Sequence, residues 1–203
     1  ELRSKQRSYG RHYYAGNLAN QTTYKLDELL ISYVINTTQL GFYSLANMLC
    51  APMVMMSQAL SNALFKDFAS RSRIPPKLFV YNTLWLLACV GGLALLSPLI
   101  VKWFFGTDYN LVASYILPLS VAYFFQGLYQ PFAFLSAKSW GRAVRNVSLA
   151  ESVINVVGNV VLILLYGVYG VILTSIAAKL THFLGLYYYY RQYQAQVSAN
   201  QYE

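Results

Sequence analysis

Polar and ionisable side chains recur at helical spacing inside apolar stretches of this chain. Carboxylates, amides, amines and imidazoles can together bind sugars, phosphates and cations, and can carry protons. Separations of three or four residues place each group on one face of a helix. The three polar faces comprise Asn17, Gln21, Lys25, Glu28, Ser32 and Asn36; Ser148, Glu151, Asn155 and Asn159; and Ser175, Lys179 and His182.

The first polar face includes two of three charged residues that stand close together in the sequence. Lys25 and Glu28 are three positions apart, so they can pair along the helix. Asp27 falls on nearly the opposite side of the same helix. We therefore expect Asp27 to find a partner on another helix or in a cavity.

Two interpretations of the polar faces compete. Asn and Ser often join membrane helices, and Lys25–Glu28 or Glu151–Lys179 can be neutralised pairs within or between helices. Alternatively, the faces line a water-filled cavity, where ionisable residues of membrane spans usually lie. Because a charge in the bilayer costs at least about 2.5 kcal/mol, the ionisable residues favour a functional role. His182, one turn from Lys179, is a candidate for proton relay.

The elements that carry these faces have the composition of membrane spans. Hydrophobic residues form 57% of the 203 residues and charged residues only 11%, against roughly 25% charged in soluble domains. No charge occurs in 29–65, 78–101, 109–137 or 152–178, and about 18 apolar residues suffice for a span. The sequence predicts one all-α integral membrane domain over 1–203, with six spans at about 11–35, 39–65, 78–103, 109–136, 143–166 and 169–190. The third span has few polar residues, so we expect it at the periphery.

Lysine and arginine residues are distributed unevenly between the two sides of this six-span arrangement. Twelve lie between or beyond spans on the side of the termini, and Lys102 lies on the other side. Since loops rich in Lys and Arg stay in the cytoplasm, both ends of the sequence are predicted to be cytoplasmic. The formal net charge of +8 is thus a topology signal and does not indicate nucleic-acid binding.

Sequence signals for an enzyme or a cofactor are missing. Cys50, Cys89, His12 and His182 are too dispersed for a metal site, and no glycine-rich phosphate loop or nucleophile elbow occurs. Both cysteines fall in predicted spans, which argues against a disulfide framework. We therefore expect no catalytic residues, no metal ligands and no cofactor.

Two segments resemble the C-terminal half of bacterial polysaccharide flippases. In "YKLDELLISYVINTTQLGFYSLANMLCAPMVMMSQALSNALF", an Asp within an apolar helix precedes a turn and a Gly-x-Tyr-Ser-x-Ala step, here Asp27 and residues 41–46. In "SVINVVGNVVLILLYGVYGVILTSIAAKL", Asn155 and Asn159 precede a Gly-x-x-Gly turn. The chain is similar to the oligosaccharide flippase branch of the multidrug/oligosaccharidyl-lipid/polysaccharide exporter superfamily.

This resemblance implies a two-lobe, twelve-helix flippase of which the chain is the C-terminal lobe. Because the sequence opens with Glu1, we expect the N-terminal lobe to lie outside it. The implied substrate is an undecaprenyl-diphosphate-linked oligosaccharide repeat unit of O-antigen, capsule or exopolysaccharide. Alternating access would move it from the cytoplasmic to the periplasmic leaflet of the bacterial inner membrane. The implied partners are this lipid, the N-terminal lobe and the polysaccharide polymerase machinery.

Under this reading the polar residues divide by their chemistry. Lysines suit the phosphates, amides suit the sugar, and carboxylates or imidazole suit a coupling proton or cation. The substrate-path candidates are Asn17, Gln21, Lys25, Glu28, Asn155, Asn159 and Lys179, and the coupling candidates are Asp27, Glu151 and His182.

Two other functions stay open. A cation-coupled multidrug exporter of the same superfamily favours a cavity dominated by carboxylates, and Asp27, Glu28 and Glu151 outnumber the two intramembrane lysines. A membrane enzyme of polysaccharide assembly needs catalytic groups in a sizeable periplasmic loop. The predicted breaks on that side are only a few residues long, which argues against such an enzyme.

Overall fold

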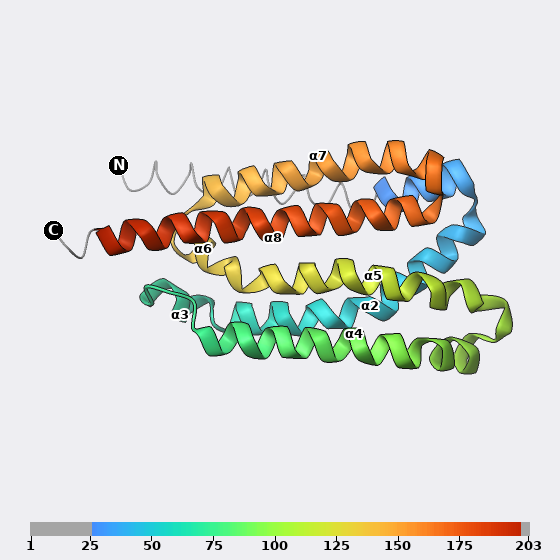
Figure 1. Cartoon of the computed structure of the whole chain (residues 1–203), viewed down its shortest axis with the longest axis horizontal. Coiled ribbons are helices and arrows are strands. Elements are labelled where there is room, and N and C mark those ends of the chain that lie inside the picture. Colours follow the sequence, from blue (N-terminus) through green and yellow to red (C-terminus); the bar gives the residue numbers. More distant parts are fainter. Residues whose placement is uncertain (1–25, 200–203) are drawn as a thin grey trace.

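The computed structural model of the chain describes residues 26–199, which form a bundle of long helices with no strand among them. The long helices lie side by side along the length of the molecule (Figure 1). After a helical turn at 26–30, the elements are η1 (Ile31–Ile35), α2 (Thr37–Ala63), α3 (Phe65–Ser70), α4 (Pro76–Phe105), η2 (Thr107–Tyr109), α5 (Asn110–Tyr129), η3 (Gln130–Phe132), α6 (Ala133–Ala137), α7 (Gly141–Tyr166) and α8 (Val168–Ala199).

Five stretches of the described residues are long and apolar enough to cross a membrane. They correspond to the second to sixth predicted spans and confirm that the described chain is helical, with five candidate membrane spans. The first predicted span, 11–35, is described only from residue 26, so the count of six stays a prediction. The five stretches are Thr37–Ala63, Pro76–Phe105, Thr107–Ala137, Gly141–Tyr166 and Val168–Ala199.

The structure differs from the predicted spans at several boundaries. α8 continues to Ala199, beyond the predicted end at 190, and in this extension Gln194 Nε2 donates to Ser72 O of the α2–α4 connection at 2.9 Å. There Tyr190 Oη accepts a hydrogen bond from the backbone of Ile74 at 3.2 Å. The fourth span is divided into α5, η3 and α6 at Pro131, which has no amide proton to continue the α-helical pattern.

The first described helix changes its winding just before it ends. Residues 26–30 are α-helical, whereas Ile31–Ile35 form a π-helical turn, which has more residues per turn. Asn36 then adopts an extended backbone, and its side-chain oxygen accepts a hydrogen bond from Gln39 N at 2.8 Å. Asn36 is therefore the N-cap of α2, and its predicted place on the polar face of the first span is wrong, since that face assumed uniform α-helical spacing.

Glycines allow α7 and α8 to approach each other closely as a hairpin. Gly167 ends α7 with φ of +59°, a conformation that L side chains rarely adopt. A Cβ atom on Gly170 would lie 2.0 Å from the carbonyl oxygen of Leu162. The Gly-x-x-Gly motif of the sequence thus forms the turn that places the polar faces of α7 and α8 against each other.

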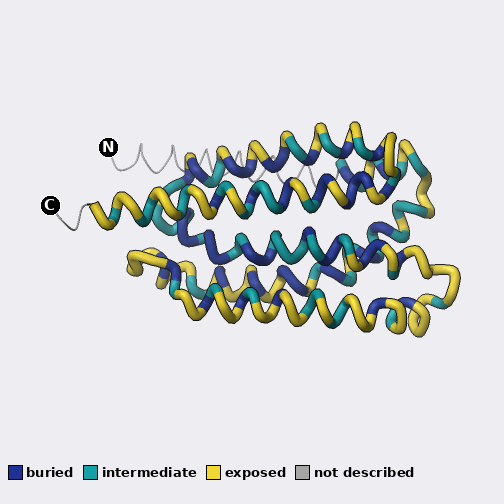
Figure 2. The backbone as a smooth tube through the Cα atoms, in the orientation of Figure 1, coloured by how far each residue is buried: buried dark blue, intermediate teal, exposed yellow. Residues whose placement is uncertain are grey.

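Burial separates the peripheral helix from the central ones. In the apolar 18-residue stretch of α4, only 17% is buried, against 50% in the corresponding stretch of α8. Figure 2 shows exposed residues along the outer side of α4, and buried residues where the other helices face one another. The expected peripheral position of the third span is confirmed.

The basic connections gather at one end of the bundle. α3, α6 and the C-terminal end of α8 lie at the same end, and Lys102 lies near the opposite end of α4 (Figure 1). The described residues therefore reproduce the uneven charge distribution seen in the sequence. That the basic end faces the cytoplasm remains a prediction.

Candidate functional site

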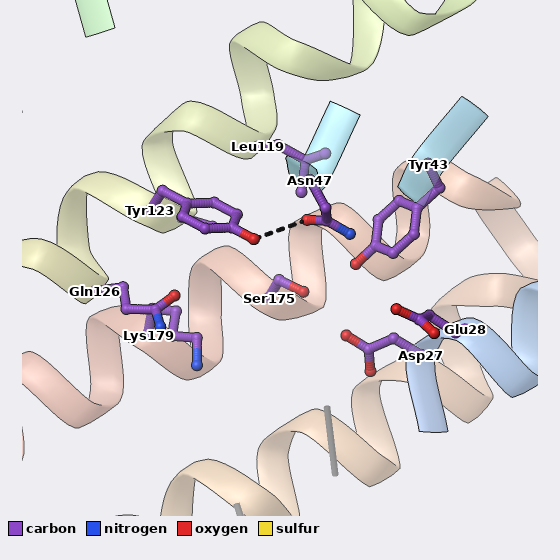
Figure 3. A pocket seen from close by; sticks show the side chains of 10 residues that line it. Asp27, Glu28, Tyr43, Asn47, Leu119, Tyr123, Gln126, Ser175 and Lys179 are labelled. Atoms are coloured by element: carbon purple, nitrogen blue, oxygen red, sulfur yellow. Dashed lines mark hydrogen bonds between the residues drawn. The ribbon is translucent and has the colours of Figure 1, made fainter. Parts of the chain in front are cut away.

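A polar pocket of about 150 Å³ lies between the first helix, α2, α5 and α8. Figure 3 shows Asp27 and Glu28 at one end of the pocket and Lys179 with Gln126 at the other, with Ser175 between them. The pocket is thus a mixed-charge site inside a bundle of apolar helices. Its lining consists of Asp27, Glu28, Tyr43, Asn47, Leu119, Ala122, Tyr123, Gln126, Ser175 and Lys179.

Behind one side of the pocket lies an amide cluster, formed by Asp27, Asn155 and Asn159. The Nδ2 group of Asn159 donates to Asp27 Oδ1 and to Asn155 Oδ1, the latter at 2.8 Å. All three side chains are buried, and Asn159 is 0% exposed. Asn159 Oδ1 has no hydrogen-bond partner within residues 26–199. The Asp27 carboxylate is therefore joined to α7 by an amide rather than by a cation.

An ion-paired cluster of Glu151, Lys179 and His182 lies further along the α7–α8 interface. Lys179 Nζ donates to Glu151 Oε1 at 2.7 Å, and His182 Nδ1 lies 2.5 Å from Glu151 Oε2. The His182 ring also stacks on Tyr129, with ring centroids 4.2 Å apart. Each of the three cluster members is about one-twentieth exposed. The Glu151 carboxylate thus contacts two nitrogen-bearing side chains of α8, one with each oxygen.

The structure separates the predicted site residues into three groups. Asp27, Glu28 and Lys179 line the pocket. Glu151, Asn155, Asn159 and His182 lie behind it, within the two clusters. The remaining candidates, Asn17, Gln21 and Lys25, lie outside the described residues.

The predicted division between Asp27 and Glu28 is only partly reproduced. Asp27 bonds to Asn159 on another helix, yet both carboxylates border the same pocket. Neighbouring helix positions differ by about 100°, so a cavity where several helices meet can contact both. The expectation that Asp27 finds a partner on another helix or in a cavity is therefore confirmed, and the structure adds that Glu28 borders the same cavity.

Sequence reasoning missed four polar contributors to the pocket: Tyr43, Asn47, Tyr123 and Gln126. Tyr123 Oη donates to Asn47 Oδ1 at 3.3 Å and so joins α5 to α2 (Figure 3). The spacing within each pair, four residues in α2 and three in α5, was a usable signal. It was weak because each helix offers one such pair rather than a continuous face.

The pocket offers acceptors, donors and one ammonium group, which suits recognition of a polar head group. Among residues 26–199, no three His, Cys, Asp or Glu side chains gather closely enough to hold a metal ion. Hydroxyls and amides can bind sugar hydroxyls, and Lys179 can bind an anionic oxygen. The arrangement is therefore suited to binding a polar solute.

Comparison with known proteins finds a similarity in the N-terminal part of the chain. A family model described as polysaccharide biosynthesis protein matches residues 4–78. No curated protein and no solved structure gives a match. The matched segment contains Asp27, Glu28, Tyr43 and Asn47, so it supplies two walls of the pocket. The similarity supports a relation to membrane proteins of polysaccharide biosynthesis.

Proposed function

We propose that this chain is one lobe of a flippase that exports lipid-linked oligosaccharide repeat units. The substrate is an oligosaccharide on undecaprenyl diphosphate, destined for O-antigen, capsule or exopolysaccharide. It moves from the cytoplasmic to the periplasmic leaflet of the inner membrane by alternating access. The main support for the proposal is the polar pocket within apolar helices. Two walls of this pocket lie in the segment that is similar to polysaccharide biosynthesis proteins.

The physical need for such a pocket follows from the substrate. A diphosphate and its sugars cannot cross hydrocarbon unaided, because each unsatisfied polar group costs several kcal/mol there. The pocket supplies Lys179 for phosphate, and Tyr43, Asn47 and Gln126 for sugar hydroxyls. At about 150 Å³, it is small beside the roughly 300–1,000 Å³ of sites for drug-sized ligands. It therefore suits one part of the head group, and a second lobe would complete the path.

Short connections at the end away from α3 and α6 support a transporter over a membrane enzyme. Asn36 alone separates η1 from α2, and Gly167 alone separates α7 from α8. Between α4 and α5 lie only Gly106 and η2. These connections leave little room for a catalytic loop.

The test is an export assay in cells that depend on this protein for surface polysaccharide. The double variant Glu151→Gln/Lys179→Gln removes the pocket cation without leaving Glu151 as an unpaired buried charge. We expect surface polysaccharide to be lost while the protein level in the membrane is unchanged. Lys102→Gln, which changes an exposed lysine far from the pocket, is the matched control and should export normally. Normal export in the double variant would contradict the proposal.

A cation-coupled multidrug exporter is the second candidate, because carboxylates dominate the pocket. Asp27 and Glu28 both line it, whereas the charge of Lys179 is balanced by Glu151. Under this alternative, deleting the gene would increase susceptibility to cationic drugs and leave surface polysaccharide intact. Loss of polysaccharide with unchanged drug susceptibility would exclude it.

A further inference from the structure

The carboxylate of Glu151 is shared by two side chains that can both carry positive charge. Its two oxygens face Lys179 Nζ at 2.7 Å and His182 Nδ1 at 2.5 Å. The three groups are buried together between α7 and α8. With His182 neutral, the negative charge of Glu151 balances the ammonium group. A proton on His182 leaves the cluster with one positive charge in excess.

Only Lys179 of these three residues reaches the pocket. Lys179 lines the cavity, while Glu151 and His182 lie behind it. Glu151 therefore holds, from behind, the one cation that the described lining offers to a bound solute. Any change in how firmly Glu151 holds Lys179 changes the electrostatic potential of the pocket.

Resting on the proposed function, we propose that protonation of His182 makes Lys179 available to an anionic group, such as a diphosphate, in the pocket. With His182 neutral, Glu151 neutralises Lys179, so the described lining offers no uncompensated cation to an anion. When His182 takes up one proton from water, the positive imidazolium balances the negative charge of the Glu151 carboxylate. Lys179 is then compensated by the bound anion, so proton and anion enter together.

The surroundings of the cluster favour this exchange. Tyr129, from α5, stacks on the His182 ring and can stabilise an imidazolium by a cation–π contact. The other titratable groups that line the cavity with Lys179 are Asp27 and Glu28 of the first helix, Tyr43 of α2 and Tyr123 of α5. Asp27 also attracts Lys179, but it is engaged by Asn159 of α7. Glu151 is thus the counter-ion in direct contact with Lys179.

The coupling between protonation and anion binding can be measured. If protonation strengthens anion binding by some factor, anion binding must strengthen protonation by the same factor. Couplings of this kind commonly amount to about 5- to 150-fold in affinity. The expected signature is net proton uptake on binding, of at most one proton for each anion.

Binding of inorganic pyrophosphate to the complete protein in lipid nanodiscs tests the proposal. Calorimetry at about pH 6 and about pH 8 compares binding at a high and a low proton concentration. His182→Phe keeps an aromatic ring against Tyr129 but cannot be protonated. Because pyrophosphate itself titrates, each variant is compared with the wild type at the same pH. We expect His182→Phe to bind more weakly than wild type at pH 6, by up to about 5- to 150-fold, and by a smaller factor at pH 8.

Glu151→Gln gives a test in the opposite direction. This variant removes the counter-ion of Lys179 without a proton, so it should bind pyrophosphate more tightly than wild type at pH 8. If His182→Phe does not fold, Glu151→Gln by itself tests the proposal. Glu151→Gln/Lys179→Gln should not bind at either pH. The proposal is overturned if His182→Phe follows the wild type at both pH values, or if Glu151→Gln shows no gain at pH 8.

The export assay separates this inference from the proposed function. Suppose that Glu151→Gln/Lys179→Gln loses export but His182→Phe keeps the pH response of the wild type. This result would refute the proposed role of His182 and leave the proposed function in place. Proton-linked pyrophosphate binding together with normal export in the double variant would refute the flippase assignment and leave the anion site in place.

Discussion

The amide cluster and the ion-paired cluster present the same group, a buried carboxylate, in two different settings. Asp27 is joined to α7 by a neutral amide, whereas Glu151 is held by an ammonium group and an imidazole. Both clusters use side chains of α7 at helical spacing. The difference lies in the facing helix, because α8 supplies Lys179 and His182 beside Glu151, and the first helix supplies Asp27 beside Asn159.

This comparison shows that helical spacing places a carboxylate but does not assign its role. The Glu151 carboxylate has a positive charge within 2.7 Å, so removing that charge is costly. The Asp27 carboxylate lies on a pocket wall with an amide behind it, so it remains able to meet a solute or a cation. We therefore expect the two clusters to respond differently to matched substitutions.

The largest effect should come from breaking the ion pair on one side. Lys179→Met leaves the Glu151 charge with His182 as its remaining partner, and we expect a loss of about 3–5 kcal/mol in the free energy of unfolding. Glu151→Gln/Lys179→Gln removes both charges and should be substantially more stable than the single variant. Denaturant unfolding of the complete protein in detergent measures both. Equal stability of Lys179→Met and the wild type would mean that the pair is not buried.

A smaller effect is expected in the amide cluster. Asn159→Ala removes the donor to the Asp27 carboxylate, and a hydrogen bond to a charged group contributes about 1.5–3 kcal/mol. Asn155→Ala is the matched control, because it removes a neutral acceptor at 2.8 Å, which contributes about 0.5–1.5 kcal/mol. The same unfolding measurement ranks the two. A larger loss for Asn155→Ala would show that Asn159 is not the main partner of Asp27.

The smallest effect should come from a charge pair outside the bundle interior. Arg71 and Asp67 approach to 4.0 Å, and their side chains are 54% and 57% exposed. Arg71→Ala should cost at most about 0.5 kcal/mol, since water screens such pairs. Thermal unfolding beside Lys179→Met checks this contrast. If Arg71→Ala and Lys179→Met lost similar free energies of unfolding, burial would not explain how the ion-paired cluster contributes to stability.

The sequence predicted the polar faces of α7 and α8 well because both helices keep uniform α-helical spacing. Glu151, Asn155 and Asn159 are buried together, as are Lys179 and His182. The first helix was predicted less well, since its π-helical turn changes the spacing after residue 30. As a result, Asn36 caps α2 rather than extending the polar face.

The amino-acid sequence by itself determined that the described chain is a bundle of apolar helices with basic residues at one end, because hydropathy and charge act residue by residue. It also determined which faces of α7 and α8 are polar. Only the tertiary structure decided that Lys179 borders the pocket while its counter-ion lies behind it, and that Tyr43, Asn47, Tyr123 and Gln126 complete the lining. Those relations join helices distant in sequence, and their relative rotation depends on close packing at positions such as Gly170, which no single helix encodes.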